Sequence, residues 1–123
     1  MAEYLPLHDD GDSITRSASA SITGGQLVIV SGSGTVAPSS AATVAWLGVA
    51  GFDASTGDNV TVFTSGVQRL TAGTGGVTAG QVVEAAANGQ VVAHTVGTND
   101  TNIVGLALST ATAGNLVEVK LTR

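Results

Sequence analysis

The residues of this chain that could perform acid–base chemistry are few and scattered. The chain has two histidines, His8 and His94, and the acids Glu84 and Glu118 lie in Val-rich segments. Glycoside hydrolysis would need two carboxyl groups that converge on one bond, but alternation with apolar neighbours predicts that these two face outward. The nucleophilic serine of a Ser-His-Asp triad can be recognised by a G-x-S-x-G elbow, and the sequence contains no such motif. We therefore predict that the protein is not an enzyme, with no catalytic residues.

Cofactor and metal motifs are also missing. A phosphate-binding loop of the G-x-x-x-x-G-K-[ST] type needs a lysine after its glycines, and the only lysine is Lys120, in a C-terminal strand pattern. The run Asp9-Asp10-Gly11-Asp12 offers oxygen ligands but lacks the spacing of a calcium loop. With His8 it makes a poor zinc set, and His94 is interpreted as a structural strand residue. We expect no cofactor and no metal.

Charge and composition narrow the possible partners. The formal net charge is −5, and charged residues make up 11% of the chain, against about 25% in typical domains. Nucleic acids and anionic membranes attract basic surfaces, so we expect neither as a partner. The chain has no cysteine and no 18-residue apolar run, so neither a disulfide nor a spanning segment is predicted. A surface with few charges is suited to burial against other proteins.

Repetition is the dominant pattern. Residues 22–36 match residues 77–91, and residues 46–62 match residues 103–119. Each repeat is too small to bury an apolar face alone, so the two are expected to share a core. The coinciding residues are Thr23/Thr78, Gly25/Gly80, Gln26/Gln81, Val28/Val83, Gly34/Gly89 and Val36/Val91, then Gly48/Gly105, Ala50/Ala107, Ala54/Ala111, Gly57/Gly114, Val60/Val117 and Val62/Val119.

Short Val-rich segments separated by Gly and Asn predict an all-β fold, a small barrel or sandwich built from two pseudo-repeated β units. Asn88-Gly89 favours a tight hairpin with positive φ at both residues. We expect one β domain over residues 16–123, with internal repeats at about 22–66 and 77–121. Trp46, Phe52 and Phe63 are interpreted as core residues. The predicted strands are 26–31, 43–50, 60–66, 81–86, 90–95, 102–109 and 116–122.

Glycines recur at the same places in both repeats and are interpreted as structural. Glycine allows a close backbone approach or positive φ. The repeated positions are Gly25, Gly48, Gly57, Gly80, Gly105 and Gly114.

Residues 1–15 lie outside the repeat. Tyr4, Leu5 and Leu7 surround Pro6, which biases the chain toward extended geometry. One interpretation is an extended N-terminal arm that docks on a neighbour, with Tyr4, Leu5, Leu7 and His8 at the interface. The alternatives are an edge strand packing on its own domain or a frayed terminus.

The glycine and valine placements resemble a known family. Thr23-Gly24-Gly25-Gln26-Leu27-Val28, Leu47-Gly48-Val49-Ala50, the turn Thr56-Gly57-Asp58, Ala79-Gly80-Gln81-Val82-Val83 and Val104-Gly105-Leu106-Ala107 are similar to the DUF2190-type phage capsid cement proteins. Residues 46–70 also resemble the lambda-type head decoration proteins. The likeness covers roughly residues 10–122.

The resemblance implies a structural capsid decoration (cement) protein of a bacteriophage virion. Such a protein binds the major capsid protein on the outer surface of a tailed-phage head after assembly in the host cytoplasm, and stabilises the mature lattice. The resemblance also implies self-association, commonly as a homotrimer. The alternative is a spike- or fibre-type binding module whose Gly-rich loops hold a host glycan.

Overall fold

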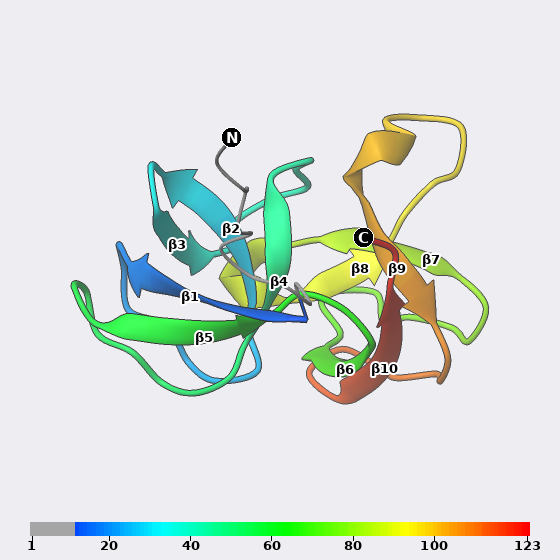
Figure 1. Ribbon diagram of the computed structural model, residues 1–123. Helices are drawn as coiled ribbons and strands as arrows, with labels where there is room; N and C mark the ends of the chain where they lie inside the picture. The colour runs from blue at the N-terminus through cyan, green and yellow to red at the C-terminus, as the bar shows by residue number, and fades with distance from the viewer. Residues whose placement is uncertain (1–11) are drawn as a thin grey trace.

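The computed structural model describes residues 12–123, which form ten β-strands and two single-turn 3-10 helices (Figure 1). Among these residues there is no α-helix, so the predicted all-β class is confirmed, and no helix is long and apolar enough to cross a membrane. The strands are β1 (Ser13–Ala18), β2 (Leu27–Gly32), β3 (Thr35–Pro38), β4 (Trp46–Ala50), β5 (Asn59–Phe63), β6 (Val67–Thr71), β7 (Val82–Ala85), β8 (Val91–Ala93), β9 (Ile103–Ala107) and β10 (Leu116–Leu121); the short helices are η1 (Ala87–Gly89) and η2 (Asp100–Asn102).

The first five strands form a closed barrel, which we call the N-terminal unit. Its strand order is β1-β3-β2-β4-β5, and β1 pairs with β5 to close the ring. The pairing of β1 with β3 is parallel, whereas the other pairings are antiparallel. Closure leaves no long unpaired strand edge on this unit.

The last five strands repeat the same order, and we call them the C-terminal unit. They form a sheet of order β6-β10-β9-β7-β8, in which each partner corresponds to one in the first barrel. A single parallel bridge between Ala72 and Val91 stands where β1 meets β3. Even the register shifts correspond, at Val28/Ile29 and at Val83/Glu84. The predicted pair of pseudo-repeated β units is thereby confirmed, and the two units lie side by side (Figure 1).

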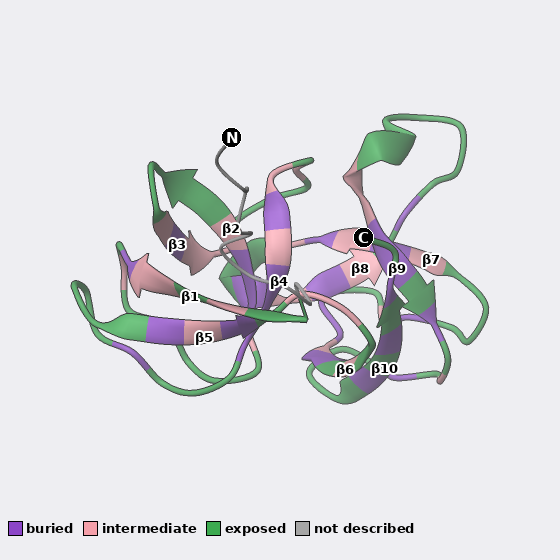
Figure 2. Ribbon diagram, viewed as in Figure 1, coloured by how far each residue is buried: buried purple, intermediate pink, exposed green. Residues whose placement is uncertain are grey.

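Alternation along the strands gives each unit its own apolar interior, as the banded colouring of Figure 2 shows. In the N-terminal unit, Val28, Val60 and Val62 are fully buried inside the barrel. Their equivalents in the C-terminal unit, Val83, Val117 and Val119, are fully buried too. The remaining buried residues of the N-terminal interior are Ala18, Ile22, Val36, Ala50 and Ala54, and their equivalents are Ala72, Val77, Val91, Ala107 and Ala111.

Two repeated glycines lie where neighbouring strands approach most closely. A Cβ added at Gly48 would lie 2.2 Å from the carbonyl oxygen of Phe63, and one at Gly105 would lie 2.2 Å from that of Lys120. Real Cβ atoms are not found so near a backbone oxygen, so a side chain at either position would push the strands apart. The other four repeated glycines, Gly25, Gly57, Gly80 and Gly114, adopt positive φ between 87° and 93°.

Two sequence expectations need correction. Phe52 and Phe63 are 49% and 41% exposed, so they are not core residues, whereas Trp46 is buried. Phe63 follows the inward-facing Val62 in β5 and therefore points outward. The boundary proposed for the N-terminal arm also shifts, because β1 begins at Ser13 and pairs with β5, so residues 13–15 belong to the barrel.

Candidate interaction surface

The outer face of the N-terminal unit carries a row of apolar residues from three adjacent strands. Leu27 of β2 is the cross-strand neighbour of Val49 in β4, and Val49 is the neighbour of Phe63 in β5. Cross-strand neighbours project to the same side of a sheet. Ile29 pairs with Trp46 next to this row. We call these residues (Leu27, Ile29, Trp46, Val49 and Phe63) the N-terminal docking face.

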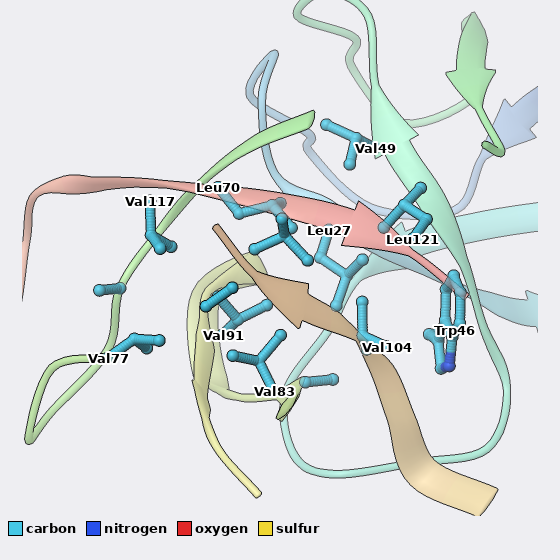
Figure 3. Packing of buried hydrophobic residues seen from close by; sticks show 14 of the residues in the cluster. Leu27, Trp46, Val49, Leu70, Val77, Val83, Val91, Val104, Val117 and Leu121 are labelled. Atoms are coloured by element: carbon cyan, nitrogen blue, oxygen red, sulfur yellow. The ribbon is translucent and has the colours of Figure 1, made fainter. Parts of the chain in front are cut away.

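Apart from Phe63, which is 41% exposed, the N-terminal docking face packs against the C-terminal unit. Leu27, Trp46 and Val49 belong to the same buried cluster as the interior of the C-terminal unit (Figure 3). Ile29, which is partly buried, packs against this cluster. The exposed fraction of Val49 is only 4%. Residues of the second unit that join this cluster beyond its own repeated interior are Leu70, Ala85, Val104 and Leu121. Apolar burial therefore joins the two units through one face.

Hydrogen bonds fix the same junction. Gln26 Nε2 donates to the carbonyl of Asn88 at 3.1 Å, and Ser39 Oγ donates to the carbonyl of Ala86 at 2.7 Å. The backbone N–H of Gly89 donates to the carbonyl of Ser39 at 3.0 Å. A Cβ at Gly89 would lie 2.5 Å from the Cβ of Gln26. The β7–β8 hairpin of the second unit is thus held tightly on the docking face of the first.

Trp46 of the N-terminal unit and Arg123, which follows β10, contact each other across the junction. The indole Nε1 of Trp46 donates to the carbonyl of Ile103 at 3.2 Å. The guanidinium of Arg123 lies 4.1 Å from the centre of the Trp46 ring and donates to the carbonyls of Val44 and Trp46. A guanidinium stacked on an indole is a favourable cation–π contact. Arg123 therefore links the end of the C-terminal unit to the N-terminal unit.

The equivalent face of the C-terminal unit is less covered by the described residues. Val82, Leu106 and Lys120 are cross-strand neighbours in β7, β9 and β10, as Leu27, Val49 and Phe63 are in the first unit. Leu106 is 39% exposed, against 4% for its equivalent Val49. Ile103, the equivalent of Trp46, is half-buried. We call Val82, Ile103 and Leu106 the C-terminal docking face.

A histidine–carboxylate cluster lies beside this face. His94, the repeat equivalent of Ser39, is buried, and its Nδ1 and Nε2 lie 2.7 Å from Glu84 Oε1 and 2.9 Å from Asp100 Oδ1. The backbone N–H of Gly97 also donates to Asp100. The hydrogen bond with Asp100, helped by that with Glu84, raises the pKa of His94 above its ordinary value of 6.5 although burial opposes it. The same bond lowers the pKa of Asp100.

The geometry of this cluster favours a structural role. Two carboxylate acceptors require both ring nitrogens to carry protons, so His94 is cationic when both bonds are made. Because the two nitrogens point away from each other, the two carboxylates do not converge on an ion together with the ring. Neither nitrogen is left to accept a proton from a nucleophile. The cluster instead joins β7, β8 and η2, the helix that begins at Asp100.

The sequence-derived interface residues Tyr4, Leu5, Leu7 and His8 lie outside the described residues. Among residues 12–123 no group of three or more His, Cys, Asp or Glu side chains is arranged to hold a metal ion. Sequence reasoning missed the ion pairs of His94 and the junction contacts of Trp46 and Arg123. The repeat alignment could have pointed to His94, because the position aligned with it in the first repeat is a serine, Ser39.

Comparison with known proteins agrees with this fold. The N base of the head fiber gp8.5 of bacteriophage phi29 has the same fold, with a TM-score of 0.71 and 19% sequence identity over 89% of this chain and 92% of that chain. No curated protein matches the sequence. The family described as phage cement protein matches residues 8–121. That match spans nearly the whole chain, and the protein therefore belongs to the phage cement protein family.

Proposed function

We propose that this protein is a capsid cement protein that binds the outer surface of a tailed-phage head, as a homotrimer, and stabilises the mature lattice. The match to the phage cement family over residues 8–121 carries the proposal. The partner is the major capsid protein. The proposed role is structural, because membership of a family of cement proteins favours a function without catalysis.

The surface chemistry supports such a role. Exposed positions of the C-terminal unit include Val67, Val96 and Leu108, while charged residues are only 11% of the chain. Burying apolar groups on a partner is favourable at about 25 cal/mol per Å². Ordering and desolvating few Lys and Glu side chains keeps the opposing terms small. The acidic net charge of −5 also favours protein over packaged nucleic acid as the partner.

Stabilisation follows from selective binding. A protein that binds only the expanded lattice favours that state by RT ln(1 + [L]/Kd), about 2.7 kcal/mol per site at a hundredfold excess over Kd. Three linked contacts in a trimer multiply a weak single-site affinity, because the second and third contacts form at high effective concentration. Neither effect requires chemistry at the surface.

The test is to add purified protein to undecorated, expanded heads and to unexpanded shells of the phage that encodes it. Co-sedimentation should show saturable binding to the expanded heads, and decorated heads should withstand a higher temperature before releasing DNA. Heads that take up no protein at saturating concentrations would overturn the proposal. A glycan array run in parallel tests the alternative of a host-glycan binding module, which the proposal expects to be silent.

Removing the N-terminal segment tests the proposed arm. The deletion should cover residues 1–11 and keep Asp12, because Asp12 accepts hydrogen bonds from Ser65 Oγ at 2.8 Å and from the backbone N–H of Thr64 at 2.9 Å. We expect an unchanged melting temperature, with weaker capsid occupancy or weaker trimer formation. Full occupancy and an intact trimer after this deletion would argue against a docking role for Tyr4, Leu5, Leu7 and His8.

A further inference from the structure

The two docking faces are equivalent by sequence, yet within residues 12–123 only the first is largely covered. We propose that the C-terminal docking face (Val82, Ile103 and Leu106) packs on the N-terminal unit of a second copy of this chain. The contact would repeat, between molecules, the junction that joins the two units within one molecule. The proposal rests on the self-association proposed above and does not depend on the capsid contact.

The complementary surface is present on the N-terminal unit and is also exposed within the part of the chain that the structure describes. Within the chain, the docking face of the first unit receives the β7–β8 hairpin, with Ala85 buried at 1% exposure and Gly89 against Gln26. The equivalents of these residues in the β2–β3 hairpin are Val30, which is 49% exposed, and Gly34, which has open space around it. We call Val30 and residues 31–34 the free hairpin.

Polar partners are also in place for a second junction. Gln26 Nε2 donates to the carbonyl of Asn88 in the existing junction. Its equivalent Gln81 is exposed, and its side-chain oxygen accepts from the backbone N–H of Thr78, just as that of Gln26 accepts from Thr23. The amide nitrogen of Gln81 would meet Ser33 of the free hairpin, because Ser33 is the equivalent of Asn88.

The existing junction is head-to-tail and not two-fold. If the two units were related by a two-fold axis, each contact would occur twice. Because Ser39 contacts Ala86, its equivalent His94 would then contact Ser31, which is the equivalent of Ala86. Instead, His94 bonds Glu84 and Asp100, and Ser31 bonds Ser19. A head-to-tail contact leaves one used and one unused copy of each surface on every molecule. Repeating it joins molecules into a ring when the rotation closes.

The intermolecular junction should be weaker than the internal one. Ile103 stands where Trp46 donates its indole hydrogen bond, and Gly66 stands where Arg123 lies over the indole ring. Lys120 and Glu84 replace Phe63 and Ile29 on the face. The fold therefore does not depend on the contact, and single substitutions on either surface should yield folded monomers.

The experiment uses the full chain and three variants, with sedimentation equilibrium as the readout. Leu106→Lys and Val30→Lys place a charge in each half of the proposed contact, and Leu116→Lys is the matched control at a site that is 60% exposed. Wild type and the control should sediment as trimers, and each of the other two as a monomer of 12.0 kDa. Far-UV circular dichroism should be unchanged in all three, and the free energy of unfolding should match wild type at a concentration that keeps wild type monomeric, because self-association itself stabilises the folded state.

Mixing the two monomeric variants distinguishes the geometry. The intact face of Val30→Lys can bind the intact hairpin of Leu106→Lys, so a head-to-tail contact predicts a heterodimer and no larger species. A two-fold contact would bring the two lysines together and give no complex. Monomeric wild type, trimeric Leu106→Lys or Val30→Lys, or an unproductive mixture would each overturn the proposal. Binding of monomeric wild type to heads would leave the cement function standing while refuting this contact.

Discussion

The two units of this chain share a framework and differ in one face. Their strand order, bridges and buried interior positions correspond one to one. On the outer face, the N-terminal unit has Leu27, Trp46 and Val49 buried in the junction, while Leu106 of the C-terminal unit remains 39% exposed. The difference teaches that the same interior positions go with the same strand order in both units, while the outer row differs in how far it is covered.

Trp46 should show the largest contrast between the units. Trp46→Ala removes a buried aromatic side chain, its hydrogen bond to Ile103 and the cation–π contact with Arg123, so we expect a loss of about 4 kcal/mol. Ile103→Ala at the equivalent position should lower the free energy of unfolding by only about 1 kcal/mol, because that side chain is half-exposed. Urea denaturation of both variants at a concentration that keeps wild type monomeric gives the comparison. Equal losses would contradict the assigned junction.

The close-approach glycines test where the units should behave alike. Gly48→Val and Gly105→Val each force a Cβ to within 2.2 Å of a carbonyl oxygen on the neighbouring strand, and each should destabilise the fold by about 3 kcal/mol. Gly114→Ala is the control, since open space surrounds that position and only the positive φ opposes it, by about 1 kcal/mol. A wild-type melting temperature in either valine variant would show that the strands can separate freely.

The glutamine pair gives a smaller effect. Gln26→Ala loses the hydrogen bond to Asn88 across the junction as well as the local bond to Thr23. Gln81→Ala loses only the local bond to Thr78. With monomeric protein, the difference in unfolding free energy should be about 1 kcal/mol. The difference should shrink if Gln81 also binds across an intermolecular contact, so the same measurement on the trimer sharpens the comparison.

The smallest effect should be a pH dependence that comes from the His94 cluster of the C-terminal unit. Because the pKa of His94 is raised in the folded state, its contribution to stability is fully present below pH 6.5 and is lost as pH rises through the folded value. The lowered pKa of Asp100 contributes stability above pH 3.8 that is lost on further acidification. His94→Gln should flatten the melting profile above pH 6, while Ser39→Ala should shift it uniformly. An unchanged profile in His94→Gln would refute this account.

The sequence predicted most of the fold because its repeat marks positions that both units need. Seven predicted segments coincide with strands, and Asn88 and Gly89 adopt the expected positive φ, although the loop spans η1 and is longer than two residues. The strands β1, β3 and β6 were missed. Residues 13–18 read SITRSA, so local apolar alternation is weak there. These residues pair with strands that are distant in the sequence, and the pattern of a single segment does not reveal such a pairing.

The candidate surfaces were harder to predict, for a physical reason. Whether Leu27 or Val82 is covered depends on how the two barrels dock, and a repeat alignment gives the two residues the same environment. Trp46 was correctly expected to be buried, yet its partner Arg123 is 77 positions away. The His94 cluster depends on Asp100, which a loop returns to the β7–β8 edge. Such contacts come from tertiary geometry that no local pattern encodes.

The closure of the strand edges has a consequence for how copies of the chain can associate. In residues 12–123, β1 closes the first sheet into a barrel, and the Ala72–Val91 bridge joins the two edges of the second sheet at one point. Sealed sheets offer few free amides to strands of other chains. Closure therefore limits pairing through strand edges between copies of this Val-rich chain, the contact on which amyloid-like stacking depends.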